Sequence, residues 1–356
     1  MFDQNTLAAK ANDRDYHSMV GGRRVSTAGV AGVVVAPEYR GSGLARQVMT
    51  HLLAEARRRG AVISTLFRTA PGLYRSLGYE EVAELVDGTY PAAALAGTRA
   101  ERTTVRRART ADGPTIRKIY ADLAASGSML LTRDGACFTA SDPELIAAFD
   151  GITVAEEDGR IVGYASWDRR SGYGQSSVLA VAELLSLTGD GYRALLSTVG
   201  SFGSVAPTVA LRTSGTDPVH WLVPGAGWQV TEVRQYMLRI VDLAGAVAAR
   251  GWPPGAQADV VLEVADPLCP WNSGRHRLLV QDGDGRIEPV AGTSSGPTAV
   301  LTVTTVTPGG LAVLYAGGVP VSTLRRGGLL TGGSASGDAE LDAAFAGPRP
   351  AILDYF

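Results

Sequence analysis

The sequence predicts an α+β protein in which mixed sheets are flanked by helices, divided among two or three domains. A β-branched run at Val33–Val35 is followed by a glycine loop, an amphipathic segment and a second apolar run, which is the order of a β–loop–α–β unit. Other short β-rich runs are separated by glycine-containing turns. The chain has 356 residues, 45% of them hydrophobic, which is more than one domain usually needs.

The first strands are expected in residues 6–35. We interpret residues 6–11 and 17–20 as one strand broken by a polar bend, and residues 24–35 as two antiparallel strands joined by a turn. A helix is predicted from Leu44 to Arg59, because Leu44, Val48, Leu52 and Ala56 recur at a spacing of four. Gly60 is expected to end the helix, and residues 61–67 to form the next strand.

The loop between the strand and this helix has the composition of an anion-binding site. Gly41 and Gly43 can adopt positive φ and let a ligand approach the backbone, and Arg40 offers a fork of donors to phosphate oxygens. The N-terminus of the following helix favours negative charge. The loop is not a P-loop, because it lacks Gly-Lys-Ser/Thr, and Arg46 occupies the last position of a dinucleotide fingerprint. An ordinary glycine turn before a helix is the alternative interpretation.

Two motifs in this region resemble those of the GNAT superfamily of N-acetyltransferases. Arg40-x-x-Gly43-x-Ala45 resembles the coenzyme A signature, and Tyr74-x-x-x-Gly78-Tyr79, directly after the second strand, resembles the element that closes the acetyl-CoA site. The resemblance implies acetyl-CoA as cosubstrate and Tyr74 as general acid, with a core tyrosine as the alternative for Tyr74. The residues that the resemblance places at the coenzyme are Val33, Val35, Arg40, Gly41, Ser42, Gly43, Leu44, Ala45 and Thr69.

The middle of the chain resembles a second, degenerate copy of this fold. An amphipathic helix is predicted through Ile116 and Leu123, and a hairpin strand at 160–167, a strand at 178–185 and a helix around 192–199 follow it. The turn before that last helix carries Asp190 where a phosphate site needs cations. Because a carboxylate repels a pyrophosphate, we expect this copy to bind no coenzyme.

The last part of the chain resembles a sterol-carrier-like domain. Strands are predicted at 259–264, as an edge-like strand, at 277–280 and at 299–303. A short helix at 307–318 follows, with Pro308 near its start and two glycines at its end. The resemblance implies an apolar cavity in this domain.

The three parts together resemble the Eis (enhanced intracellular survival) family of acetyltransferases. We expect an N-terminal GNAT domain at 1–100, a degenerate GNAT-like domain at 101–242 and a sterol-carrier-like domain at 243–356. The resemblance implies acetylation of amines, including aminoglycosides and lysine side chains, and a homohexamer. Members of the family begin with a further strand and two helices that form one wall of the acceptor pocket, and this sequence lacks them.

The resemblance also implies a role for Phe356. In the Eis family the α-carboxylate of a final phenylalanine projects into the site, and this sequence ends Ile-Leu-Asp-Tyr-Phe. The α-carboxylate is a weak base, with a reference pKa of about 3.5, but it can accept a proton through water or orient the amine. A frayed tail is the alternative. Tyr355 stands where the family often has glutamate, which puts a preference for polycationic aminoglycosides in question.

Composition excludes some classes of partner and indicates a cellular compartment. The net charge of −2 carries no nucleic-acid footprint. Cys137 and Cys269 share no disulfide or metal spacing, so we expect two buried thiols and no metal. Without a signal peptide or an uninterrupted apolar span, the protein is expected to be soluble and cytoplasmic, with no membrane partner. We therefore predict an acetyl-CoA-dependent N-acetyltransferase acting on a primary amine. A non-catalytic module that binds acyl-CoA or lipid is the alternative.

Overall fold

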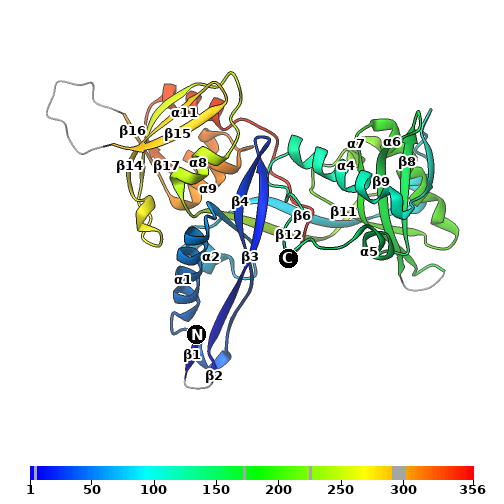
Figure 1. The fold of residues 1–356 in the computed structure, drawn as a ribbon, viewed down its shortest axis with the longest axis horizontal. Helices are drawn as coiled ribbons and strands as arrows, with labels where there is room; N and C mark the ends of the chain where they lie inside the picture. Colours follow the sequence, from blue (N-terminus) through cyan, green and yellow to red (C-terminus); the bar gives the residue numbers. More distant parts are fainter. Residues whose placement is uncertain (4–5, 171–173, 224–226, 291–301) are drawn as a thin grey trace. The chain divides into compact units, whose positions relative to one another are not determined.

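The structure, a computed structural model, describes residues 1–3, 6–170, 174–223, 227–290 and 302–356. The chain divides into two compact units (Figure 1). The first unit comprises Met1–Ala83, Ala125–Cys137 and Gln235–Phe356, and the second comprises Glu84–Ala124 and Phe138–Arg234. In the described part of the chain, no helix is long and apolar enough to cross a membrane.

The N-terminal part of the first unit is a mixed sheet with strand order β3-β4-β5-β12. Strands β3 and β4 form a long antiparallel hairpin, β5 runs parallel to β4, and the second half of β12 runs antiparallel to β5 (Figure 1). Helix α1 packs against β3 and β4. The bounds are β1 (Phe2–Asp3), β2 (Thr6–Leu7), β3 (Ala9–Val20), β4 (Arg23–Val35), α1 (Leu44–Arg59), β5 (Ile63–Phe67), α2 (Pro71–Ser76) and β12 (Gln229–Ile240).

Two of the predictions for these strands are wrong. Strand β3 is continuous through the polar residues 12–15, because this stretch pairs with β4 and Asp13 forms a 2.6 Å ion pair with Arg59 of α1. Strand β4 is also continuous, and the turn that was predicted within it lies earlier, at Gly21 and Gly22, both of which have positive φ.

The predicted helix at 44–59 is confirmed at both ends. Gly43 and Gly60 flank α1 in the left-handed conformation, with φ of 80° and 96°. Its buried face carries Met49, Leu52 and Leu53, and each large apolar side chain buried in this way contributes roughly 1.5–3 kcal/mol. These side chains share one hydrophobic cluster with Val30, Leu66, Tyr74, Leu77, Tyr79 and Met237.

The C-terminal part of the first unit is a five-stranded sheet with order β15-β14-β13-β16-β17. The predicted strand at 259–264 is central rather than an edge, because β13 pairs with β14 on one side and β16 on the other. Of the predicted strand at 299–303, residues 299–301 lie outside the described residues. The bounds are α8 (Leu243–Ala249), β13 (Ala258–Val264), β14 (Gly274–Gln281), β15 (Asp284–Pro289), β16 (Val303–Val306), α9 (Pro308–Ala316), α10 (Val321–Arg326), β17 (Leu330–Gly332) and α11 (Ala335–Ala344).

The second unit is built on a sheet with strand order β6-β11-β10-β9-β8-β7. The predicted hairpin before β9 is present, and its turn at Asp158 and Gly159 has positive φ at both residues. Helix α6 packs against β8, β9 and β10. The bounds are β6 (Glu80–Pro91), α3 (Ala92–Ala96), β7 (Thr104–Arg107), α4 (Gly113–Ser126), α5 (Asp142–Ala147), β8 (Gly151–Glu157), β9 (Arg160–Arg170), β10 (Val178–Ser186), α6 (Gly189–Gly200), β11 (Thr208–Thr213) and α7 (Val219–Leu222).

Candidate active site

The two parallel strands of the N-terminal sheet, β4 and β5, separate before the chain reaches the Arg40 motif. Strands β4 and β5 pair from Thr27–Ile63 to Gly29–Thr65, and within the described residues their ladder ends there, although β4 continues to Val35. Strand β4 also carries a β-bulge at Gly32, with φ of 58°, because Lys10 of β3 opposes Val34 whereas Asn12 opposes Ala31. A bulge bends its strand and re-aims the residues after it. Val33 and Val35 therefore lie on a stretch of β4 that has left its parallel partner.

The loop that follows β4 is shaped to receive an anion. Gly41 and Gly43 both have φ of 80°, and a Cβ on either would meet no atom within 4 Å, so the space outside the loop is open. Gly43 is the N-cap of α1 and supplies no side-chain acceptor. The N–H groups of Leu44 and Ala45 in the first turn of α1 are therefore left to an external acceptor.

A free cation stands beside this loop. Arg40 is exposed and, within the described part of the chain, forms no ion pair. The hydroxyl group of Ser42 donates to the carbonyl oxygen of Tyr39, which fixes the turn, and Arg46 Nη1 donates to the carbonyl oxygen of Ser76 at 3.3 Å. Three features of this loop fit the pyrophosphate of coenzyme A. They are the open space beside Gly41 and Gly43, the N-terminus of α1 without a side-chain cap, and the Arg40 guanidinium, which has no ion-pair partner among the described residues.

Tyr74 lies on α2, the helix that follows β5 and the exposed Thr69. Its side chain is 4% exposed and packs in the cluster with Val30 and Leu66. Its hydroxyl group makes no hydrogen bond to any of the described residues. The proton of that hydroxyl group is thus not committed to a neighbouring side chain.

The segment after α2 is fastened to the parting strands. Tyr79 Oη and Ser64 Oγ are 2.7 Å apart, and Ser64 Oγ donates to the carbonyl oxygen of Ala28 at 3.0 Å. Burial raises the pKa of the Tyr79 hydroxyl group well above its ordinary value. This chain of bonds joins β4, β5 and the Tyr74 element at the place where the two strands separate.

The C-terminal tail is docked on the same sheet. Arg133 Nε bonds Asp354 Oδ1 at 2.9 Å, and Ile352 and Leu353 are buried. The ring of Phe356 lies in an aromatic cluster, with centroid distances of 4.8 Å to Tyr16, 5.6 Å to Phe67 and 6.1 Å to Tyr236. The ring of Tyr355 packs against that of Phe67 in a tilted arrangement, with a centroid distance of 4.8 Å.

Tyr74 and Phe356 approach the parting strands from opposite faces of the sheet. A Cβ on Gly29 would clash with the ring of Tyr16 and lie 3.2 Å from that of Phe356, so the bare α-carbon admits both rings. Alternation along β5 places Thr65 and Phe67 on the Phe356 face, whereas Ser64 and Leu66 point toward the Tyr74 element.

Two buried hydroxyl groups on the Phe356 face lack a hydrogen bond of good geometry. Thr65 Oγ1 and the Tyr236 hydroxyl group lie close enough to interact with each other, but among the described residues neither meets the geometry of a full hydrogen bond. A buried hydroxyl group left unpaired costs about 1–3 kcal/mol, which favours a polar group or water at this position. The sequence analysis missed Thr65, Tyr236 and Tyr16. Gly29, a glycine inside a strand, was the one signal of a close approach.

The corresponding helix N-terminus in the second unit is closed. Asp190 accepts the backbone N–H groups of Glu101, Arg102 and Thr103 at 2.9–3.0 Å, and Thr188 Oγ1 caps the N–H group of Gly191 at 3.0 Å. The N–H groups of residues 101–103 hold the pKa of the Asp190 carboxyl well below its usual range. Residues 101–103 hold the Asp190 carboxylate at the start of α6, where a carboxylate repels a pyrophosphate. This arrangement supports the prediction that the second copy binds no coenzyme.

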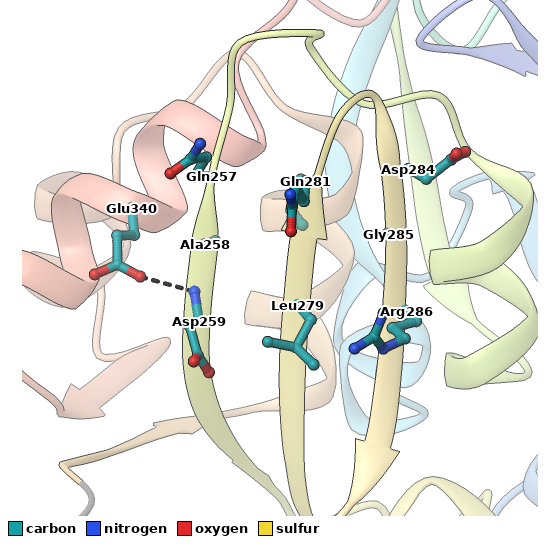
Figure 2. Close-up of a pocket in the computed structure, with 10 residues that line it drawn as sticks. Gln257, Ala258, Asp259, Leu279, Gln281, Asp284, Gly285, Arg286 and Glu340 are labelled. Atoms are coloured by element: carbon teal, nitrogen blue, oxygen red, sulfur yellow. Dashed lines mark hydrogen bonds between the residues drawn. The ribbon is translucent and has the colours of Figure 1, made fainter.

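A cavity of about 630 Å³ opens on the five-stranded sheet of the first unit. Figure 2 shows its mixed lining, in which Asp259, Asp284, Arg286 and Glu340 of β13, β15 and α11 lie beside Leu279 of β14, and Glu340 accepts the N–H group of Asp259 at 2.8 Å. A lipid tail needs apolar walls. This cavity therefore does not match the apolar one that the sterol-carrier resemblance implies.

The two cysteines differ in their exposure to solvent. Cys269 is buried as predicted, but the prediction is wrong for Cys137, which is exposed because the segment around it forms no helix or strand. Among the described residues, no group of three or more His, Cys, Asp or Glu side chains could hold a metal ion.

Comparison with known proteins identifies the domains of the chain. Residues 1–82 and 132–240 each match an acetyltransferase (GNAT) domain, and residues 243–353 match a sterol carrier protein domain. A GCN5-related N-acetyltransferase from Kribbella flavida has 36% sequence identity and a TM-score of 0.85, with the match covering 100% of this chain and 86% of that one. The chain belongs to the GCN5-related N-acetyltransferase family. It is thus an acyltransferase with two GNAT folds and a sterol-carrier-like domain, as the sequence predicted.

More distant relatives extend the match. An N-acetyltransferase of Streptomyces coelicolor is 29% identical over 348 residues, which cover 91% of this chain and 79% of that protein. The fold is shared with Eis1 from Mycobacterium abscessus, at 22% identity and a TM-score of 0.74 over 100% of this chain and 89% of that one.

Proposed function

We propose that the protein transfers the acetyl group of acetyl-CoA to a primary amine of a small molecule or of a lysine side chain. The observation that carries the proposal is the open loop at Gly41 and Gly43, which leads into an uncapped α1 directly after β4 has parted from β5. Acetyl-CoA supplies a thioester, whose carbonyl carbon is attacked by the amine, and coenzyme A leaves as the thiol. Arg40, Gly41, Ser42, Gly43, Leu44 and Ala45 hold the pyrophosphate, and Val33, Val35 and Thr69 lie along the remainder of the coenzyme.

The proton transfers fall to residues on the two faces of the sheet. A C–N bond forms and a C–S bond breaks, so one proton must leave the amine and one must reach the sulfur. Tyr74, whose hydroxyl group is uncommitted, donates to the sulfur. The carboxyl group of Phe356, whose ring is held by Tyr16 and Phe67, accepts the amine proton through water or orients the amine.

The acceptor enters on the Phe356 face. The rings of Tyr16, Phe67 and Tyr236 lie around that of Phe356, and aromatic rings attract amines and ammonium groups. An aminoglycoside-like amine and a peptide lysine both meet these requirements.

A thiol-release assay separates the enzyme from a binding module. The full chain is mixed with acetyl-CoA and, in turn, an aminoglycoside, a polyamine and a lysine-containing peptide. The proposal predicts free thiol only when an amine is present. Binding of acetyl-CoA without amine-dependent release by any of the three classes would instead support the non-catalytic module. The Arg58→Ala variant, altered at an exposed side chain near the C-terminal end of α1, serves as the control.

We propose further that the chain works in the cytoplasm as a homo-oligomer, with the hexamer of the Eis resemblance as the expected state. Light scattering after size-exclusion chromatography gives the mass of the assembly. Six times the mass of one chain supports this proposal, and a monomer contradicts it.

A further inference from the structure

The second unit contains a cavity of about 400 Å³ that the acetyl-transfer site does not use. Strands β10 and β11 contribute Ala180, Ala182 and Ala210 to its lining, and these small side chains leave the space. This volume is within the range of pockets that hold small ligands.

The cavity lies at a position that repeats the geometry of the first fold. Strands β10 and β11 are parallel, and among the described residues their ladder ends at Val181–Leu211, two residues that line the cavity. Strand β10 has a β-bulge between Val181 and Glu183, as β4 has at Gly32. The second fold thus keeps the parting strands and the bulge of the first.

A ligand here cannot be held in the manner of a coenzyme. The N-terminus of α6 is capped by Thr188, and Asp190 is bound by the backbone of residues 101–103. The side chains that line the cavity must therefore recognise the ligand. A ligand bound in this way does not require a pyrophosphate group.

Most charges in the cavity already have partners. Asp87 accepts from Arg212 Nε at 3.2 Å and from Arg234, and Arg234 also bonds Glu232. By contrast, among the residues that the structure describes, Arg170 forms no ion pair and Asp168 accepts only the N–H group of Asp150, at 2.8 Å. One guanidinium and one carboxylate are thus left for a ligand.

These two groups project from one face of β9. Residues two apart on a strand share a face and are separated by about 7 Å. A guanidinium fork binds a carboxylate, and a carboxylate binds an ammonium group. We propose that this cavity binds a small zwitterion of the α-amino acid class, with the ligand carboxylate on Arg170 and its ammonium group on Asp168.

The test is calorimetric titration of the full chain with L-alanine, L-leucine and L-glutamate. Saturable binding of at least one of them is expected, weakened at least tenfold by Arg170→Gln and by Asp168→Asn. The variant Arg160→Gln, at the exposed start of the same strand, should bind as the wild type does. Thermal melting checks that each variant is folded.

Ligand analogues test the chemistry separately from the acceptor site. The N-acetyl and the amide derivatives of the bound amino acid each lack one charge, and each should bind at least tenfold more weakly. The proposal is overturned if none of the three amino acids binds, or if binding persists unchanged in both Arg170→Gln and Asp168→Asn. Persistence in those variants would place the amino acid elsewhere, for example at the acetyl-transfer site.

Discussion

Arg239 and Asp266 form a buried ion pair in the first unit, in which Arg239 Nη2 donates to both carboxylate oxygens, at 2.7 and 2.9 Å. The side chains are 1% and 4% exposed. Arg239 Nη1 also donates to the carbonyl oxygen of Leu77, and a Cβ on Gly78 would clash with that nitrogen. The pair joins β12, the end of the Tyr74 element and the loop after β13.

Removing one partner of this pair should destabilise the protein strongly. Asp266→Ala leaves a buried, uncompensated guanidinium and frees the N–H groups of Leu268 and Cys269, so we expect a loss of about 3–5 kcal/mol. Urea unfolding followed by circular dichroism measures the loss. Asp284→Ala, which breaks an exposed pair with Arg23, should change the midpoint little. Equal midpoints for the two variants would contradict a structural role for Asp266.

Acid should destabilise the second unit through two carboxylates. Bonds from Arg106 to Asp112, and from residues 101–103 to Asp190, lower the pKa of both groups in the folded state. The unfolded chain then binds more protons, so this stability is complete above the unfolded pKa of about 3.9 and is lost as the pH falls below it. Melting temperatures from pH 6 to pH 2.5 should fall less steeply in Asp190→Asn than in the wild type. Parallel curves would disprove the contribution of Asp190.

Replacement of Tyr74 tests the general acid. Tyr74→Phe keeps the ring in its cluster but removes the proton donor, so kcat should fall by about 10²- to 10⁴-fold while acetyl-CoA binding stays near that of the wild type. Steady-state kinetics and calorimetry measure the two quantities. A kcat within a factor of two of the wild-type value would exclude Tyr74 as the acid.

Loss of Phe356 tests the docked tail. A chain without Phe356 loses the ring contacts to Tyr16 and Phe67 and shifts the terminal carboxyl group, so amine-dependent turnover should disappear while acetyl-CoA still binds. Phe356→Tyr, which preserves the ring, is the matched control and should retain most turnover. Unchanged turnover in the shortened chain would remove the tail from the site.

Local signals made parts of this structure predictable. The bounds of α1 follow from Gly43 and Gly60, whose left-handed conformations stop a helix by themselves. The order of the motifs around Arg40 and Tyr74 identified the family. The exposed position of Arg40 and the open space beside Gly41 and Gly43 depend on the loop itself, so the local sequence was enough to predict them.

Features that depend on distant contacts were not predictable. Residues 24–35 were predicted to be two strands joined by a turn, but they form one strand, in which Gly29 makes room for the rings of Tyr16 and Phe356 from other parts of the chain. The central place of β13 depends on which strands pair with it, and a single sequence does not show this pairing. The aromatic partners of the tail come from β3, β5 and β12 and share no sequence pattern.

The number of acetyl-CoA molecules bound to each chain tests the central claim most directly. Isothermal titration of the full chain should give one site per chain, since the loop at Gly41 and Gly43 is open whereas the α6 N-terminus is closed. Arg40→Ala should weaken that site by roughly 10- to 100-fold, the effect of losing a charge-assisted hydrogen bond. Arg58→Ala, at the far end of α1, should leave it unchanged. Two sites per chain, or one site insensitive to Arg40→Ala, would contradict the account.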